Sequence, residues 1–101
     1  MIGFESTALA RTHLRAALHP YDLTMRPQMV TREDAPDYHD LLSKFATLTG
    51  TGGVLNTSFN IHGKPIVMSP RDALTAFANC GLTVMALEDY LVTKLSSGAV
   101  L

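Results

Sequence analysis

The stretch from Leu55 to Val67 constrains the fold most strongly, because polar residues interrupt an apolar run there and a glycine turn follows. Val54 and Leu55 begin a β-prone segment, and four of the five residues from Asn56 to Asn60 then carry side-chain hydrogen-bonding groups. A plain buried strand would continue the apolar run, since each unpaired buried amide or hydroxyl costs on the order of 1–3 kcal/mol. The segment therefore predicts a strand over residues 54–59 whose polar side chains contact another polar group.

A helix with clear boundaries is predicted upstream of this strand. Asp34 is placed to cap it, Pro36 lies in its first turn and Gly50 ends it. Its apolar positions from Tyr38 to Leu48 repeat at helical spacing, so we expect them in the core.

A second helix begins at Ser69, where a capping hydroxyl, a proline at the first helical position and Asp72 three residues after the cap occur together. Gly81 ends it, and two β-prone runs separated only by Glu88 and Asp89 follow. Weaker patterns predict a helix at about 6–18, ended by Pro20, and extended segments at 25–30 and 65–68.

This alternation of helices and strands predicts an α/β or α+β fold in which helices pack on a small sheet. A chain of 101 residues has room for one domain. We expect residues 1–24 to form a loosely packed N-terminal segment, residues 25–95 the main domain and residues 96–101 a flexible tail.

Composition argues against several classes of partner. The formal net charge is −1, which gives no basic surface for nucleic acid. Neither a membrane-spanning apolar run nor a signal peptide is present, so we expect a cytoplasmic protein that does not bind membranes. Cys80 is the single cysteine and the four histidines lack ligand spacing, so neither a disulfide nor a metal site is expected.

Several spaced motifs resemble the C-terminal domain of carbamoyltransferases of the NodU/CmcH type. Arg26-Pro27-Gln28 and Leu48-Thr49-Gly50 also fall where that family has similar residues, so the resemblance covers residues 25–94. The motifs that carry it are Leu55-Asn56-Thr57-Ser58-Phe59-Asn60, then Gly63-x-Pro65-Ile66-Val67, then Pro70-x-Asp72-Ala73, and the strand pair over residues 82–92.

The resemblance implies part of a YrdC-like domain, with a small twisted mixed sheet and helices packed on it. In that family a Ser-x-Asn pattern, here Ser58 and Asn60, contacts ATP and carbamoyl phosphate during formation of a carbamoyl-adenylate. An actin-like N-terminal domain, in the same or a separate polypeptide, then passes the carbamoyl group to a hydroxyl of a small-molecule acceptor. That domain lies outside these residues, so we do not expect activity from this chain alone.

The candidate binding residues all have side chains that can form hydrogen bonds with a phosphate. Hydroxyls and carboxamides give neutral hydrogen bonds to phosphate oxygens, and an arginine gives a charge-assisted one. No residue is assigned a catalytic role. The candidates are Ser58, Asn60, Arg26, Asn56, Thr57 and His62.

The residues alone leave plainer interpretations open. Ser58 and Asn60 also suit a role in bonding the main chain of their own turn, and Arg26 suits a surface ion pair. His62 is also typical of a solvated turn. Lys64 and Arg71 either steer an anion or face water.

Two further interpretations concern the rest of the chain. Cys80 has the setting of a buried structural thiol. The alternative to an enzyme part is a non-catalytic, truncated or split module that docks to an actin-like partner or to itself, or a remnant that binds no ligand. A partial domain of this kind is expected to expose apolar surface and to self-associate.

Overall fold

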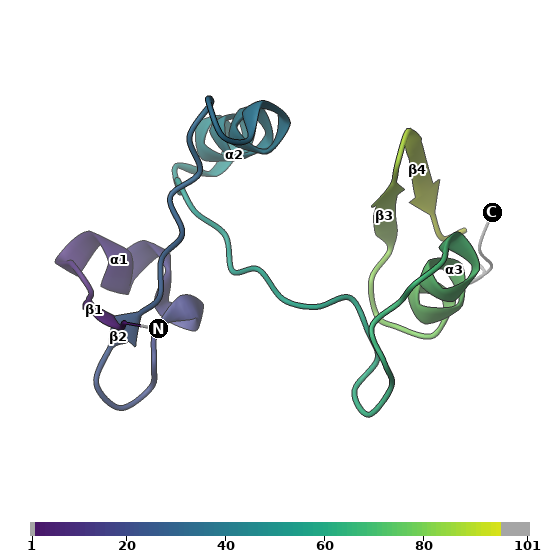
Figure 1. Ribbon diagram of the computed structural model, residues 1–101, viewed down its shortest axis with the longest axis horizontal. Coiled ribbons are helices and arrows are strands. Elements are labelled where there is room, and N and C mark those ends of the chain that lie inside the picture. The colour runs from purple at the N-terminus through teal and green to yellow at the C-terminus, as the bar shows by residue number, and fades with distance from the viewer. Residues whose placement is uncertain (1, 96–101) are drawn as a thin grey trace. The chain divides into compact units, whose positions relative to one another are not determined.

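The computed structural model describes residues 2–95, and the tail predicted at 96–101 lies outside them. Figure 1 shows how the helices and short strands follow one another along the chain. The chain packs as two compact units, which we name the N-terminal unit (Met1–Asn56) and the C-terminal unit (Thr57–Leu101).

The N-terminal unit contains a short antiparallel strand pair. β1 (Phe4–Glu5) pairs with β2 (Thr24–Met25), with Phe4 opposite Met25. Among the described residues of this unit, the buried side chains are Leu18 and Ser6, and the Ser6 hydroxyl accepts a hydrogen bond from Nε of Arg11 at 3.0 Å.

The helix predicted over residues 6–18 is divided in two. α1 (Ala8–His13) begins at Thr7, whose hydroxyl caps the helix, and it ends at Leu14, whose φ of −122° lies outside the helical region. A single 3₁₀ turn, η1 (Arg15–Ala17), continues the chain.

The long helix α2 (Pro36–Thr49) has the predicted proline start, and Gly50 ends it with a φ of 76°. The prediction that Asp34 caps it is wrong, because Ala35 is the residue at the cap position. The Asp34 carboxylate instead accepts the Thr31 hydroxyl at 2.6 Å, and the Thr31 oxygen accepts the Asp34 N–H at 3.1 Å. Because the carboxylate is bonded within this local turn, it does not accept a main-chain N–H of the first turn of α2.

The apolar face of α2 is exposed, so the prediction that Tyr38 to Leu48 forms the core is also wrong. No residue of the helix is buried, and Leu41 and Leu48 are 61% and 86% exposed. Helical spacing of apolar residues predicts which face of a helix is apolar, but not whether other residues of the same unit cover that face.

The C-terminal unit packs on α3 (Pro70–Ala78), whose predicted start is confirmed. The Ser69 hydroxyl accepts the N–H of Asp72 at 3.1 Å, and the Asp72 carboxylate accepts the N–H of Met68 at 3.3 Å. Ala73, Ala76 and Phe77 are the buried residues of this helix.

The predicted pair of strands after α3 is confirmed. β3 (Val84–Leu87) and β4 (Tyr90–Thr93) form an antiparallel hairpin in which Leu87 lies opposite Tyr90. Glu88, in the two-residue turn, has a φ of 52°.

The predicted α+β class is confirmed, since helices alternate with small sheets along residues 2–95. Both sheets are two-stranded and antiparallel in this part of the chain, where the resemblance implied one mixed sheet. The strand predicted at 54–59 does not form, because it has no paired strand beside it: one main-chain bond, from the N–H of Val67 to the carbonyl of Phe59, joins it to the segment 65–68. The division of residues 1–24 from residues 25–95 stays a prediction.

Candidate functional site

Residues 58–67 of the C-terminal unit, which we name the motif loop, fold back on themselves through a tight turn. The N–H of Lys64 donates to the carbonyl of Ile61 at 2.8 Å, and Gly63 has a φ of 80° at the third position. This is the geometry of a type II turn, which favours glycine there. The N–H of Val67 then bonds to the carbonyl of Phe59 at 3.1 Å, which closes the loop.

Ser58 and Asn60 are brought together by this loop. The Ser58 hydroxyl donates to Oδ1 of Asn60 at 2.6 Å, and Nδ2 of Asn60 donates to the carbonyl of Lys64 at 3.0 Å. The side chains therefore do support their own turn. Because the serine proton is used, Ser58 must rotate its hydroxyl away from Asn60 before it can donate to a phosphate oxygen.

The same two side chains also line a cavity of about 490 Å³ within the C-terminal unit. This volume lies in the usual range for small-molecule sites, roughly 300–1,000 Å³. Four of the six candidate residues are in its wall. The lining residues are Thr57, Ser58, Phe59, Asn60, Ile61 and His62 from the motif, with Ala76, Asn79, Cys80 and Leu82 from the end of α3 and the segment after it.

The other two candidates, Arg26 and Asn56, line a separate cavity of about 990 Å³ in the N-terminal unit. Its walls come from residues around η1, from β2 and the segment after it, from the face of α2 that carries Leu42 and Ala46, and from residues 52–56. The six candidates are thus divided between two cavities, one in each unit.

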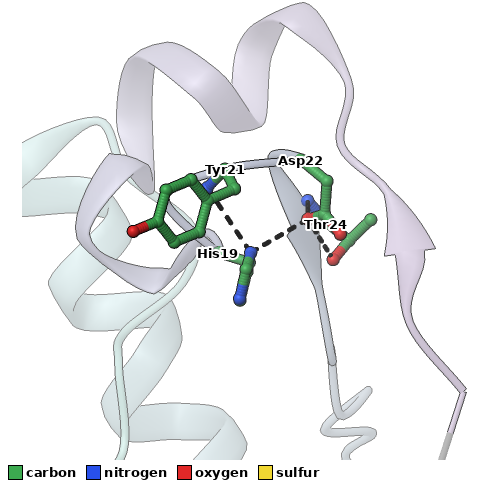
Figure 2. A network of polar contacts seen from close by, with 4 residues as sticks. All are labelled: His19, Tyr21, Asp22 and Thr24. Carbon is green, nitrogen blue, oxygen red and sulfur yellow. Dashed lines mark hydrogen bonds and ion pairs between the residues drawn. The ribbon is translucent and has the colours of Figure 1, made fainter.

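A polar network shapes the loop that leads into β2 and Arg26 (Figure 2). Oδ1 of Asp22 accepts the N–H of Thr24 at 2.9 Å and its hydroxyl at 2.7 Å, and lies 3.3 Å from Nδ1 of His19. The bond from the Thr24 N–H, helped by the hydroxyl and by His19, holds the pKa of the Asp22 carboxyl below its usual value. This network was not predicted from the sequence, although the Asp-x-Thr spacing is typical of such turns.

Asn79 and Cys80 were also missed as cavity residues. Cys80 is half-buried, and its Sγ donates to the carbonyl of Phe77 at 3.3 Å. Nδ2 of Asn79 donates to the carbonyl of Thr75 at 2.8 Å. Folding places these residues in the same cavity wall as motif residues 57–62, about twenty positions earlier. No local sequence pattern predicts that proximity.

Among residues 2–95, no group of three or more histidine, cysteine, aspartate or glutamate side chains is arranged to hold a metal ion. No helix in this part of the chain combines the length and the apolar character needed to cross a bilayer.

Comparison with known proteins gives one consistent result. Residues 1–94 match the family model described as carbamoyltransferase C-terminus. The chain is 49% identical over 81 residues to an uncharacterized protein of Methanocaldococcus jannaschii, covering 80% of this chain and 13% of that protein. It is 36% identical over 85 residues to nodulation protein NolO of Bradyrhizobium diazoefficiens, covering 84% of this chain and 16% of NolO.

A named enzyme is also similar. The chain is 34% identical over 76 residues to the 3'-hydroxymethylcephem-O-carbamoyltransferase of Amycolatopsis lactamdurans, covering 75% of this chain and 14% of that protein. The chain thus spans between 13% and 16% of the length of these three relatives. The family match covers nearly all of the chain and agrees with the motifs, so the protein belongs to the carbamoyltransferase C-terminus family.

Proposed function

We propose that this chain supplies the nucleotide- and carbamoyl phosphate-binding part of an O-carbamoyltransferase. In this reaction carbamoyl phosphate, ATP and one water give a carbamoyl-adenylate, pyrophosphate and phosphate. The carbamoyl group then passes to a hydroxyl of a small-molecule acceptor and AMP leaves. An actin-like domain, in the same or a separate polypeptide, is the proposed site of this transfer, and the cytoplasm is the proposed compartment.

The observation that carries the proposal is the Ser58–Asn60 pair at the wall of the 490 Å³ cavity. On ligand binding, the Ser58 hydroxyl leaves Oδ1 of Asn60 and donates to a phosphate oxygen. Thr57 and His62 line the same cavity and stay predicted contacts. Arg26 and Asn56, in the wall of the other cavity, also stay predicted contacts.

Isothermal titration with ATP, with carbamoyl phosphate and with both tests this proposal. Two neutral hydrogen bonds of about 1 kcal/mol each predict that Ser58→Ala combined with Asn60→Ala weakens binding about tenfold or more. Thr75→Ala is the matched control, since it removes a hydroxyl in the same unit that bonds only to the carbonyl of Arg71 at 2.9 Å. Equal affinity of the double variant and the wild type would refute the site.

A second candidate function is that of a docking module, and the exposed apolar face of α2 supports it. Leu41 and Leu48 lie on this face with most of their surface in water. Exposed apolar patches of this kind mark association sites in soluble proteins. The proposed occupant is the actin-like partner domain or a second copy of the chain.

A further inference from the structure

The loop that leads into β2 is fixed at several points, and Figure 2 shows its polar side chains. The main-chain N–H of His19 donates to the carbonyl of Thr24 at 2.8 Å, and the N–H of Leu23 donates to the carbonyl of His19 at 3.0 Å. Within these residues, which we name the 19–24 loop, Oδ1 of Asp22 accepts both the N–H and the hydroxyl of Thr24. The carboxylate and the main-chain bonds together therefore set the direction in which the chain leaves Thr24.

The backbone of Leu23 shows that the 19–24 loop needs this support. Its φ of 58° lies in the left-handed region, where a residue with a Cβ is less stable than in the extended or right-handed regions. Such a conformation persists only where the surrounding structure holds it. Leu23 lies between Asp22 and Thr24, so the bonds between these two residues span the strained position. Without the carboxylate, Leu23 can return to a negative φ, and the chain after it changes direction.

Arg26 follows the 19–24 loop by two residues. Thr24 is in β2, and Pro27 favours an extended backbone at Arg26, so the side chains at positions 24 and 26 leave the chain on the same side. Both residues line the cavity of about 990 Å³ in the N-terminal unit, whereas Asp22 is not among the described residues of that wall. Asp22 is therefore placed to act on this cavity through the main chain.

We propose that Asp22 is a positioning residue, which fixes the main chain at Thr24 and thereby the placement of Arg26 at the cavity wall. The inference rests on the proposed function, in which Arg26 is a predicted ligand contact, and adds to it the group that orients this arginine. A guanidinium binds a phosphate through two parallel hydrogen bonds, whose strength depends on its orientation. A change in chain direction before Arg26 therefore weakens such a contact.

The first test needs no ligand. The order parameter of the main-chain amide of Arg26, from nitrogen-15 NMR relaxation, measures how firmly the chain is held after the 19–24 loop. Asp22→Ala is expected to lower it from the value of a rigid backbone, about 0.85, toward about 0.6. Asp22→Asn keeps an oxygen that accepts both donors of Thr24, so it is expected to retain most of the order.

Asp34→Ala is the matched control for this test. The Asp34 carboxylate accepts the hydroxyl of Thr31 at 2.6 Å, much as Asp22 accepts that of Thr24 at 2.7 Å, but its turn leads into α2. This control is expected to leave the order parameter of Arg26 unchanged, and circular dichroism checks that each variant is folded. If neither alanine variant lowers the order parameter, or both lower it equally, the inference is overturned.

A double-mutant cycle with Arg26 is the second test, with ATP and carbamoyl phosphate as probes in isothermal titration. Asp22→Ala is expected to weaken binding about fivefold in the wild-type background and less than about twofold in the Arg26→Ala background, because its effect passes through the arginine. Asp22→Asn should recover most of the affinity. Equal losses in the two backgrounds would show that Asp22 supports the unit as a whole, and would overturn the inference.

The inference and the proposed function fail in different ways. If neither probe binds the wild-type chain, the proposed function fails, and the order parameter of Arg26 alone decides whether Asp22 fixes its placement. Binding that Arg26→Ala weakens and Asp22→Ala does not would remove the inference and leave the proposed function.

Discussion

Nζ of Lys94 lies 5.0 Å from the ring centroid of Phe77 and donates to the carbonyl of Cys80. The same lysine bonds through its main-chain N–H to the carbonyl of Thr83 at 3.0 Å. One residue therefore ties the end of β4 both to the core of α3 and to the segment that leaves it. Phe77 is fully buried and is the largest fully buried side chain of the described residues, so this contact holds the end of β4 against the core of the C-terminal unit.

Phe77→Ala is expected to destabilise the C-terminal unit by about 3–5 kcal/mol, because it removes a buried ring and leaves a cavity. Urea unfolding followed by circular dichroism measures this change. Tyr90→Ala is the control, since Tyr90 is 74% exposed and its loss is expected to change stability by less than about 1 kcal/mol. Similar losses for the two variants would show that Phe77 is not the core of this unit.

Lys94→Met is expected to cost about 1 kcal/mol, because methionine keeps the hydrocarbon stem but loses the charge over the ring and the bond to the Cys80 carbonyl. The same unfolding measurement applies. Lys94→Arg should recover part of the loss, since a guanidinium also stacks on aromatic rings. A Lys94→Met chain as stable as the wild type would show that these two contacts of Lys94 do not stabilise the unit.

Gly63→Ala is expected to destabilise the motif loop by about 1–2 kcal/mol, because alanine is disfavoured at a φ of 80°. A Cβ there meets no atom within 4 Å, so the whole effect is conformational. Gly81→Ala is the matched control, with equal space and no positive φ. Thermal unfolding compares the two, and the turn assignment is wrong if Gly81→Ala is the more harmful change.

The Asp22 network predicts a loss of stability in acid. The folded state lowers the pKa of this carboxyl, so its contribution is fully present above the ordinary carboxyl pKa, near about pH 4. The contribution disappears as the pH falls through the lowered pKa of the folded chain. A carbon-13 titration of the Asp22 carboxyl by NMR measures the midpoint, and Thr24→Val, which removes the hydroxyl donor, should raise it. An unshifted midpoint in the wild type would contradict the network.

The exposed face of α2 predicts self-association of the chain. Light scattering with size-exclusion chromatography is expected to show species larger than a monomer, and Leu41→Lys with Leu48→Lys should restore the monomer. Thr47→Lys adds a charge to another exposed position of the same helix and is the control. A wild-type monomer at all concentrations would remove the second copy as occupant of this face.

Local signals in the sequence predicted local structure well. The Ser69 start of α3 is confirmed, because a cap, a proline and an acid act within four residues. The two strands around Glu88 and Asp89 are also confirmed, because they are neighbours in sequence and pair across a two-residue turn. Asp34 shows the limit of such signals, since a competing bond from Thr31 took the carboxylate before the helix began.

Features that depend on distant partners were not predictable. The strand expected at 54–59 has β-prone residues but lacks a paired strand, and the face of α2 has apolar residues but lacks a covering layer. In the candidate site, the loop pattern indicated Ser58 and Asn60, but not that the two would bond to each other. Asn79 entered the cavity wall only through folding.

The most direct test of the central claim is an NMR titration of the chain with ATP, following the side-chain amide of Asn60. The account predicts saturable shifts of this signal and of the main-chain amides of residues 57–62, all weakened in Ser58→Ala. An Asn60 signal that stays unchanged while ATP binds elsewhere, or while it does not bind at all, would contradict the account.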